Sequence, residues 1–200
     1  MPESATPQPS VWNIPNQITA ARLILSIALF VVLPFEQYTA ALILFIAAAT
    51  TDWVDGYWAR KYNLVTQLGR IFDPFVDKIL ICGTFIYLAA IPGSGLLPWM
   101  TVVIVGRELL VTVLRSYLEQ QGADFSAKMS GKLKMVLQCV AAAASLLVLE
   151  IIRRGNPVPA WLDWLLWGGV VSAIVLTIYS GVVYIVAAAR LLGPQNAPPS

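Results

Sequence analysis

Four aspartates stand at short, regular intervals between strongly hydrophobic stretches of this 200-residue chain. They are Asp52, Asp55, Asp73 and Asp77. Ionised carboxylates are costly near hydrocarbon, and carboxylates that gather there repel one another unless a cation neutralises them. Hard divalent cations such as Mg²⁺, Mn²⁺ or Ca²⁺ take oxygen ligands and keep coordination positions for phosphate oxygens. The aspartates therefore predict a metal site that handles phosphate groups.

The first two aspartates share one face of a predicted helix with two small residues. Asp52 is followed at i+3, i+4 and i+7 by Asp55, Gly56 and Ala59. These positions line up along a helix. Because Gly56 and Ala59 carry little or no side chain, a ligand can approach the backbone beside the carboxylates.

The last two aspartates predict the start of the next helix. Asp is favoured at a helix N-cap and Pro at the first helical position, so Asp73 and Pro74 predict a helix that opens there. Asp77 lies one turn further along. Two antiparallel helices, joined by the polar stretch 60–72, then bring the four carboxylates together. A structural salt-bridge network and an exposed capping cluster are the alternatives that the residues leave open.

Composition places these carboxylates in a membrane protein. The chain is 58% hydrophobic and only 12% charged, whereas a soluble domain is about a quarter charged. A chain of this length cannot bury so much apolar surface by itself. The net charge of +2 is too small to indicate nucleic-acid binding, and the absence of histidine, with only two cysteines, argues against a zinc site.

Six hydrophobic segments are long enough to cross a bilayer as helices. They lie near 18–36, 39–60, 74–91, 97–119, 132–152 and 164–190. The predicted fold class is all-α integral membrane, with six transmembrane helices. A short interfacial helix over 14–23 is expected to precede the first span. We expect residues 13–192 to form a single domain, with disordered polar ends at 1–12 and 193–200.

Basic residues predict the orientation. With the N-terminus in the cytoplasm, eleven of the 13 Lys and Arg residues fall on the cytoplasmic side. The other two, Arg153 and Arg154, fall on the far side. This asymmetry predicts a multi-pass protein of the inner (plasma) membrane with both termini and the aspartates cytoplasmic. Trp99, Trp161 and Trp164, near predicted helix ends, are typical of an interfacial aromatic belt.

The aspartate pattern resembles a known family signature. Residues 52–77 read D-x2-D-G-x2-A-R-x8-G-x3-D-x3-D, which is similar at every fixed position to the signature of the CDP-alcohol phosphotransferases. The resemblance implies a six-span, homodimeric membrane enzyme. In such an enzyme an alcohol attacks the diphosphate of a CDP-linked donor and CMP leaves.

The resemblance also implies roles for the aspartates. Asp52, Asp55 and Asp73 are expected to bind two Mg²⁺ or Mn²⁺ ions together with the donor diphosphate. Asp77 is expected to be both a metal ligand and the general base. A chain without histidine needs a carboxylate for that proton transfer.

Four further signature residues are expected to contact the CDP-linked donor. By the same resemblance, Gly56 and Ala59 leave room for the cytidine. Arg60 and Gly69 border the nucleotide. Outside the signature, Asn16, Thr19 and Arg22 follow one stripe of the first helix and could touch the nucleotide or diphosphate, although capping and interfacial anchoring explain them equally well.

Flanking segments narrow the acceptor alcohol. The stretches "NIPNQITAARLIL" at 13–25, "GRELLVTVLR" at 106–115 and "SGKLKMVLQ" at 130–138 resemble the bacterial phosphatidylglycerophosphate synthase branch of that family. The implied reaction joins CDP-diacylglycerol and sn-glycerol 3-phosphate to give phosphatidylglycerophosphate and CMP. The implied partners are these two substrates, the lipid bilayer and a second copy of the chain.

A dianionic acceptor needs a basic site. Arg107, Arg115, Lys132 and Lys134 are the candidates to hold its phosphate. An arginine in the middle of a membrane span, such as Arg107, usually has a function. A structural ion pair with Glu108 is the alternative. Ordinary positive-inside topology is the alternative for the lysines.

Other functions remain possible at this point. The same chemistry could use phosphatidylglycerol, giving cardiolipin, or an inositol phosphate, while the basic site argues against serine. A cation transporter lined by carboxylates belongs to a different class. It predicts acidic residues along the whole crossing path, whereas the aspartates cluster at one end of the spans.

Overall fold

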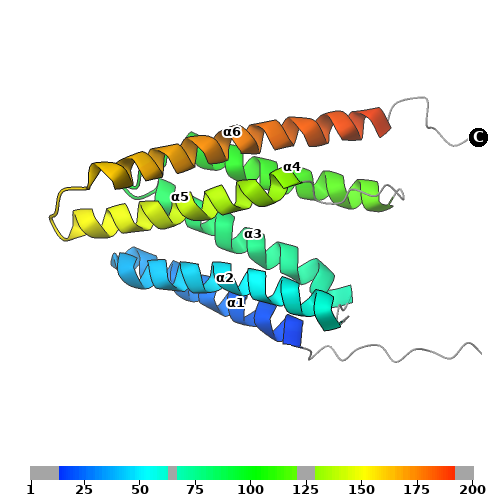
Figure 1. Ribbon diagram of the computed structural model, residues 1–200, viewed down its shortest axis with the longest axis horizontal. Coiled ribbons are helices and arrows are strands. Elements are labelled where there is room, and N and C mark those ends of the chain that lie inside the picture. Colours follow the sequence, from blue (N-terminus) through cyan, green and yellow to red (C-terminus); the bar gives the residue numbers. More distant parts are fainter. Residues whose placement is uncertain (1–13, 63–66, 121–128, 192–200) are drawn as a thin grey trace, which may run out of the picture. The chain divides into compact units, whose positions relative to one another are not determined.

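The computed structural model describes the backbone of residues 14–62, 67–120 and 129–191, and the side chains of residues 16–51, 72–117 and 133–189. All regular elements in these ranges are helical, which confirms the predicted all-α class for them. In chain order they are α1 (Ile14–Val32), the 3-10 helix η1 (Leu33–Phe35), α2 (Tyr38–Tyr62), α3 (Gln67–Ala89), α4 (Pro98–Gln120), α5 (Met129–Arg153) and α6 (Ala160–Leu191) (Figure 1).

Three helical stretches in the described chain are long and apolar enough to cross a membrane. They are Asn16–Phe35, Leu133–Arg153 and Ala160–Ala189. Tyr38–Thr51 is a shorter apolar helix. The chain is therefore a membrane protein, while the count of six spans stays a prediction. Residues 14–23, expected as a separate interfacial helix, are continuous with the rest of α1.

The outward faces of the helices are apolar, as lipid requires. Ile24 and Ile27 of α1 and Val175 and Val182 of α6 are all more than half exposed. A helix at the surface of a soluble protein carries polar residues on such a face, whereas a helix that is apolar all round lies in a core or a membrane. The exposed residues therefore support the membrane assignment independently of helix length.

Tryptophans mark the start of two helices. Trp99 lies in the first turn of α4, and Trp161 and Trp164 lie in the first turns of α6. All three side chains are more than half exposed. This is the placement that an interfacial belt requires, because the indole ring is apolar and its N–H prefers the wet side.

The chain divides into two compact units, Met1–Tyr87 and Leu88–Ser200, which are described separately. In the first unit α1 and α2 pack side by side (Figure 1). The turn between them needs a left-handed residue, and Glu36 supplies it with φ 56° while its N–H donates to the Leu33 carbonyl at 3.0 Å. Leu29 and Phe45 are buried in this unit.

Helix α3 packs on α1 through two aromatic rings. Phe30 stacks on Tyr87 with ring centroids 5.6 Å apart. Gly83 leaves the space for Phe30, because a Cβ on Gly83 would lie 2.3 Å from the ring. This contact fixes the C-terminal half of α3 against α1.

The predicted start of the third helix at Asp73 is wrong. Helix α3 begins at Gln67, and Pro74 lies inside it. Proline lacks the N–H that would donate to the carbonyl four residues earlier, so the helix loses one internal hydrogen bond there. The pair Asp73–Pro74 starts a helix only where the preceding residues are not helical. Here residues 67–72 are helical, so the helix begins nearly two turns earlier.

In the second unit, α6 packs along both α5 and α4. Gly169 of α6 lies against α5 so closely that its Cβ position is 3.5 Å from the backbone of Ala141. The turn before α6 contains Gly155 at φ 71°, and the Gly155 N–H donates to the Ile152 carbonyl at 2.9 Å. Small residues thus let the two long helices approach each other.

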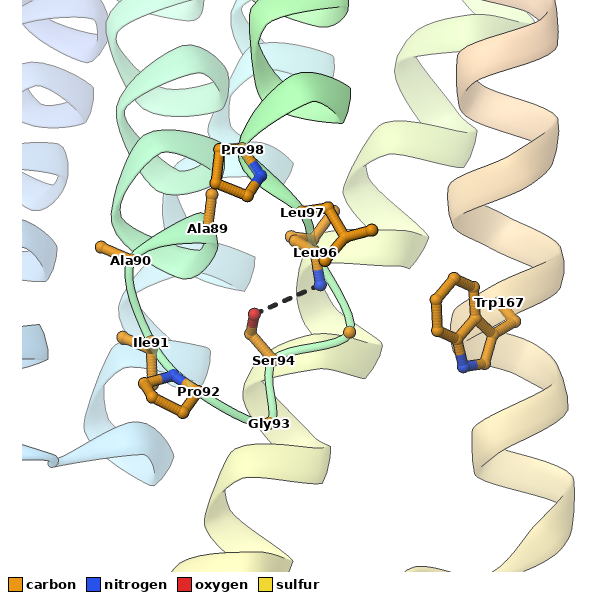
Figure 2. Close-up of a pocket in the computed structure, with 11 residues that line it drawn as sticks. Ala89, Ala90, Ile91, Pro92, Gly93, Ser94, Leu96, Leu97, Pro98 and Trp167 are labelled. Carbon is orange, nitrogen blue, oxygen red and sulfur yellow. Dashed lines mark hydrogen bonds between the residues drawn. The ribbon is translucent and has the colours of Figure 1, made fainter.

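The loop between α3 and α4 forms a small pocket. Residues 89–98 line it together with Trp167 of α6, and its volume is about 300 Å³ (Figure 2). The Ser94 hydroxyl accepts a hydrogen bond from the Leu96 N–H at 3.2 Å. The Ser94 carbonyl accepts one from the Ser145 hydroxyl at 2.7 Å. These bonds hold the loop in place against α5.

A buried carboxylate closes the end of α5. Glu150 is 5% exposed and accepts hydrogen bonds from Arg153 at 2.8 and 3.2 Å and from Arg154 at 2.6 Å. The Arg154 side chain is 60% exposed. Two cations at the solvent end therefore compensate one buried acid.

Enlarging Gly169 should separate α5 from α6, whereas the same change at its neighbour should not. We expect Gly169→Leu to lower the free energy of unfolding by about 1–3 kcal/mol, the usual effect of overpacking. Gly168 has no atom within 4 Å of its Cβ position, so Gly168→Leu is the matched control. Thermal unfolding in detergent, followed by circular dichroism, measures both variants. Equal destabilisation by the two changes would contradict this packing.

Candidate functional site

The aspartate pattern lies on two helices of the first unit. Asp52, Asp55, Gly56, Ala59 and Arg60 fall on the C-terminal half of α2, and Gly69, Asp73 and Asp77 on α3. The helical backbone of α2 confirms that the residues at i, i+3, i+4 and i+7 share one face. The side chains of residues 52–69 lie outside the described part, so the meeting of all four carboxylates stays a prediction.

Two of the four carboxylates are described in detail. Asp73 and Asp77 are one turn apart on α3 and both are half-buried. The hydroxyl of Thr19 on α1 donates a hydrogen bond to Oδ1 of Asp73. Oδ1 of Asp77 is buried. The nearby cation Lys78 directs its ammonium to the Pro74 carbonyl at 3.2 Å. Thr19 therefore fixes the orientation of one carboxylate from a neighbouring helix.

The stripe on α1 faces inward. Thr19 is 4% exposed and Arg22 is fully buried. Anchoring at the membrane surface requires exposed side chains, so their burial argues against the anchoring alternative. A buried guanidinium needs an acidic group or an anion beside it. The buried Arg22 and the hydrogen bond from Thr19 to Asp73 together support a contribution of α1 to the aspartate site.

Oxygen ligands for a hard cation are present on α3. Carboxylates such as those of Asp73 and Asp77 are the ligands that Mg²⁺ and Mn²⁺ prefer. No group of three or more acidic, histidine or cysteine residues converges among the side chains that the structure describes. The predicted metal set includes Asp52 and Asp55, which are outside those side chains. The described part of the set fits a divalent cation in its chemistry.

A second cluster of charged residues lies between α4 and α5 of the second unit. Lys134 of α5 donates to Oε1 of Glu108 on α4. Arg107 approaches the same oxygen at 3.5 Å. The three side chains are 5%, 13% and 10% exposed, in the order Lys134, Glu108 and Arg107. Their burial excludes the alternative that Lys134 serves only as a surface topology signal.

Arg115 and Lys132 are the remaining basic candidates for the acceptor phosphate. Arg115 is half-buried on α4, two turns beyond Arg107. Lys132 lies in the first turn of α5, with its side chain outside the described part. The structure thus brings Arg107 and Lys134 together around Glu108, while a contribution of Arg115 and Lys132 stays a prediction.

Sequence reasoning missed the part that α6 plays. The hydroxyl of Ser180 accepts a hydrogen bond from Nε of Arg107 at 3.1 Å, and the ring of Tyr184 lies 5.7 Å from the Arg107 Cζ. A signal was available: Thr177, Ser180, Gly181 and Tyr184 stand at i, i+3, i+4 and i+7 in an otherwise apolar helix. Such a polar stripe marks the face that meets a polar partner.

The charge of this cluster favours an anion. Two cations share one carboxylate, so the three buried side chains carry a formal net charge of +1. Buried charge at membrane depth is costly unless it is paired. A phosphate would complete the balance, because arginine and lysine are its usual protein partners.

The sequence matches one family model and several curated proteins. Residues 12–188 match the model described as CDP-alcohol phosphatidyltransferase. A protein of Bacillus subtilis is 42% identical over 68% of this chain and 78% of its own length. Proteins of Pseudomonas fluorescens and Escherichia coli K12 are 35% and 31% identical over 88% of this chain and 90% and 95% of theirs. All three are named CDP-diacylglycerol–glycerol-3-phosphate 3-phosphatidyltransferase.

The pair between Lys134 and Glu108 should make a strong contribution to stability. Lys134→Met and Glu108→Gln each leave a buried charge without its main partner, which costs about 3–5 kcal/mol. The double variant should lose less than the sum of the two, because the Lys134 ammonium and the Glu108 carboxylate are then removed together. Chemical denaturation in detergent measures this cycle.

Arg154→Met is the control for that cycle. It removes a cation that is 60% exposed, so its effect should stay below about 1 kcal/mol. Additive losses in the double variant would show that Lys134 and Glu108 are not coupled.

Proposed function

The chain belongs to the CDP-alcohol phosphatidyltransferase family, and from this we propose that it transfers a phosphatidyl group from CDP-diacylglycerol to sn-glycerol 3-phosphate. The products are phosphatidylglycerophosphate and CMP. One observation carries the choice of acceptor: relatives at 31–42% identity, of which the chain covers 78–95%, share the name of this activity. The buried, positively charged cluster around Glu108 supports an anionic acceptor.

The carboxylates of α2 and α3 bind the donor. Asp52, Asp55 and Asp73 hold two Mg²⁺ or Mn²⁺ ions, together with Asp77. When bound, these ions screen the diphosphate and stabilise the phosphate that leaves with CMP. Thr19 supports this assignment, because its hydrogen bond orients Asp73 from α1.

Small and basic residues beside the aspartates accommodate the nucleotide. Gly56 and Ala59, on the same face of α2 as the first two aspartates, leave room for the cytidine. Arg60 and Gly69 border it. These four positions match the family signature, and the continuous α2 backbone supports the shared face of Gly56 and Ala59.

Asp77 acts as the general base. The acceptor hydroxyl gives its proton to the Asp77 carboxylate while its oxygen forms a bond to the lipid-side phosphorus of CDP-diacylglycerol. The bond from that phosphorus to the bridging oxygen breaks, and CMP carries the electron pair away. A carboxylate has to do this work, because the chain contains no histidine.

Basic side chains of the second unit hold the acceptor phosphate. Arg107 and Lys134 lead this set, since both are buried and both approach the Glu108 carboxylate. Arg115, two turns beyond Arg107 on α4, and Lys132, in the first turn of α5, complete it. A bidentate guanidinium contact fixes the orientation of a phosphate as well as its position.

We propose the following arrangement in the cell. Residues 13–192 form one six-span domain, supported by a single family model that covers 12–188. The first turns of α1 lie at the membrane surface, and the protein is a homodimer in the inner (plasma) membrane. The polar ends that the sequence predicts to be disordered, 1–12 and 193–200, lie outside the described residues. The excess of basic residues on one side supports cytoplasmic termini and a cytoplasmic active site.

Purified protein should release CMP from CDP-diacylglycerol in the presence of Mg²⁺ and glycerol 3-phosphate. Phosphatidylglycerol, an inositol phosphate and serine should not replace that acceptor. Asp77→Asn should fold normally but turn over at least about 100-fold more slowly, because it removes the general base. Asp163→Asn, at an exposed position in the first turn of α6, is the control and should retain full activity.

Two results would count against this function. Turnover with serine or phosphatidylglycerol in preference to glycerol 3-phosphate would assign the chain to another branch of the family. Cation flux in liposomes without CDP-diacylglycerol, together with no CMP release, would indicate the transporter alternative.

Removal of divalent cations should stop the reaction. We expect EDTA to reduce CMP release to background, and added Mg²⁺ or Mn²⁺ to restore it, because four carboxylates cannot hold a diphosphate without cations. Thermal unfolding of the protein with and without EDTA is the control for loss of fold. Full activity in EDTA with a folded protein would remove the metal ions from the proposal.

A further inference from the structure

One face of α6 surrounds the side chain of Arg107. Ser180, Gly181 and Tyr184 are all buried and occupy neighbouring positions of the helix at i, i+1 and i+4. Each meets a different part of the arginine. Ser180 meets Nε, Gly181 meets Cγ, and the Tyr184 ring lies beneath Cζ.

The hydroxyl of Ser180 has a fixed orientation. It donates its proton to the Thr177 carbonyl at 3.1 Å. Its lone pairs are then available to accept the hydrogen bond from Nε of Arg107 at 3.1 Å. A hydroxyl that donates to its own helix can only be an acceptor for a cation, so Ser180 fixes the inner edge of the guanidinium.

The other two residues contact the aliphatic part and the guanidinium of Arg107. A Cβ at Gly181 would lie 3.3 Å from Cγ of Arg107, which is tighter than an ordinary contact. Glycine therefore allows the aliphatic part of Arg107 to lie against α6. The Tyr184 ring, 5.7 Å from Cζ, attracts the guanidinium through its π face.

The outer edge of Arg107 has weaker protein contacts. Nη1 reaches Oε1 of Glu108 at 3.5 Å, the limit of a hydrogen bond, and that oxygen is already held by Lys134. Among the described residues, the guanidinium makes no other hydrogen bond, ion pair or cation–π contact. Its terminal N–H groups are thus available to a ligand. Nε is occupied by Ser180, and Cζ lies over the ring of Tyr184.

We propose that Ser180, Gly181 and Tyr184 are positioning residues, which hold Arg107 so that its terminal nitrogens bind the phosphate of the acceptor. This inference rests on the proposed function for the identity of the acceptor. It gives the last helix, which is otherwise apolar, a role in substrate specificity. A fork-shaped guanidinium recognises phosphate through two parallel hydrogen bonds, so a small tilt of its plane weakens binding.

Tyr184→Leu and Tyr184→Phe separate positioning from packing. Leucine removes the π face but keeps an apolar side chain, so the KM for glycerol 3-phosphate should rise roughly tenfold. Phenylalanine keeps the face and should stay within about twofold of wild type. The value of kcat and the KM for CDP-diacylglycerol should not change in either variant, because Arg107 binds the phosphate equally in ground and transition states.

Ser180→Ala is an independent test of the positioning of Arg107. Losing the acceptor for Nε should also raise the KM for glycerol 3-phosphate several-fold. Tyr179→Leu and Ser172→Ala are the matched controls, since both residues are exposed on the same helix. Neither control should change any kinetic constant.

A binding measurement distinguishes failure of the inference from failure of the proposed function. Inorganic phosphate, without any CDP-diacylglycerol, should raise the unfolding temperature of wild type and of Tyr184→Phe. The rise should be smaller in Tyr184→Leu and Ser180→Ala. If wild type does not turn over glycerol 3-phosphate, the proposed function fails, and this measurement still tests the site.

Two outcomes would overturn the inference. One is a wild-type response to phosphate in both Tyr184→Leu and Ser180→Ala. The other is a fall in kcat with no change in the KM for glycerol 3-phosphate, which would show that these residues contribute only to helix packing. A rise in acceptor KM with a reduced phosphate response supports it.

Discussion

The unfavourable energy of charge inside a bundle of apolar helices shapes the rest of this structure. Water is scarce there, so each acid or base needs a partner from another helix or from its own. Lys134 and Arg107 meet Glu108 within the second unit. Glu150 is held by the two arginines that follow it. In the first unit Thr19 donates to Asp73 across two helices. The clusters around Glu108 and Asp73 each join residues of different helices, and both are candidates for binding phosphate groups.

The aspartates of α2 and α3 and the cluster around Glu108 differ in sign, and the proposed function assigns them to two different substrates. The four aspartates of α2 and α3 are predicted to form a negatively charged cluster that would bind divalent cations, and through them a diphosphate. The cluster around Glu108 carries an excess of positive charge and suits a phosphate directly. Helix α6 supports the second cluster from an otherwise apolar surface, with a serine, a glycine and a tyrosine that contact Arg107. A lipid-facing helix can therefore also contribute to a polar site through one narrow face.

Most of the helical framework was predictable from hydropathy alone. Each predicted span overlaps one α-helix, because long apolar runs bounded by Pro and Gly favour helices. The count of six membrane spans stays a prediction. The start of α3 was not predictable, since Asp73–Pro74 is a local signal and Pro74 is tolerated inside a longer helix. The α6 contact to Arg107 was not predicted either. Its polar stripe is visible in the sequence, but the partner is a residue more than 70 positions away.

By itself, the sequence determined the membrane class, the helices and the spacing of the aspartates, because hydropathy and helical periodicity act over neighbouring residues. It also determined the family, through a pattern of fixed residues at fixed intervals. Only the tertiary structure decided which charges are paired. Lys134 could have been a surface residue that reports topology, yet it is buried on Glu108. That choice depends on how α4, α5 and α6 pack, and packing depends on side chains that are distant in the chain.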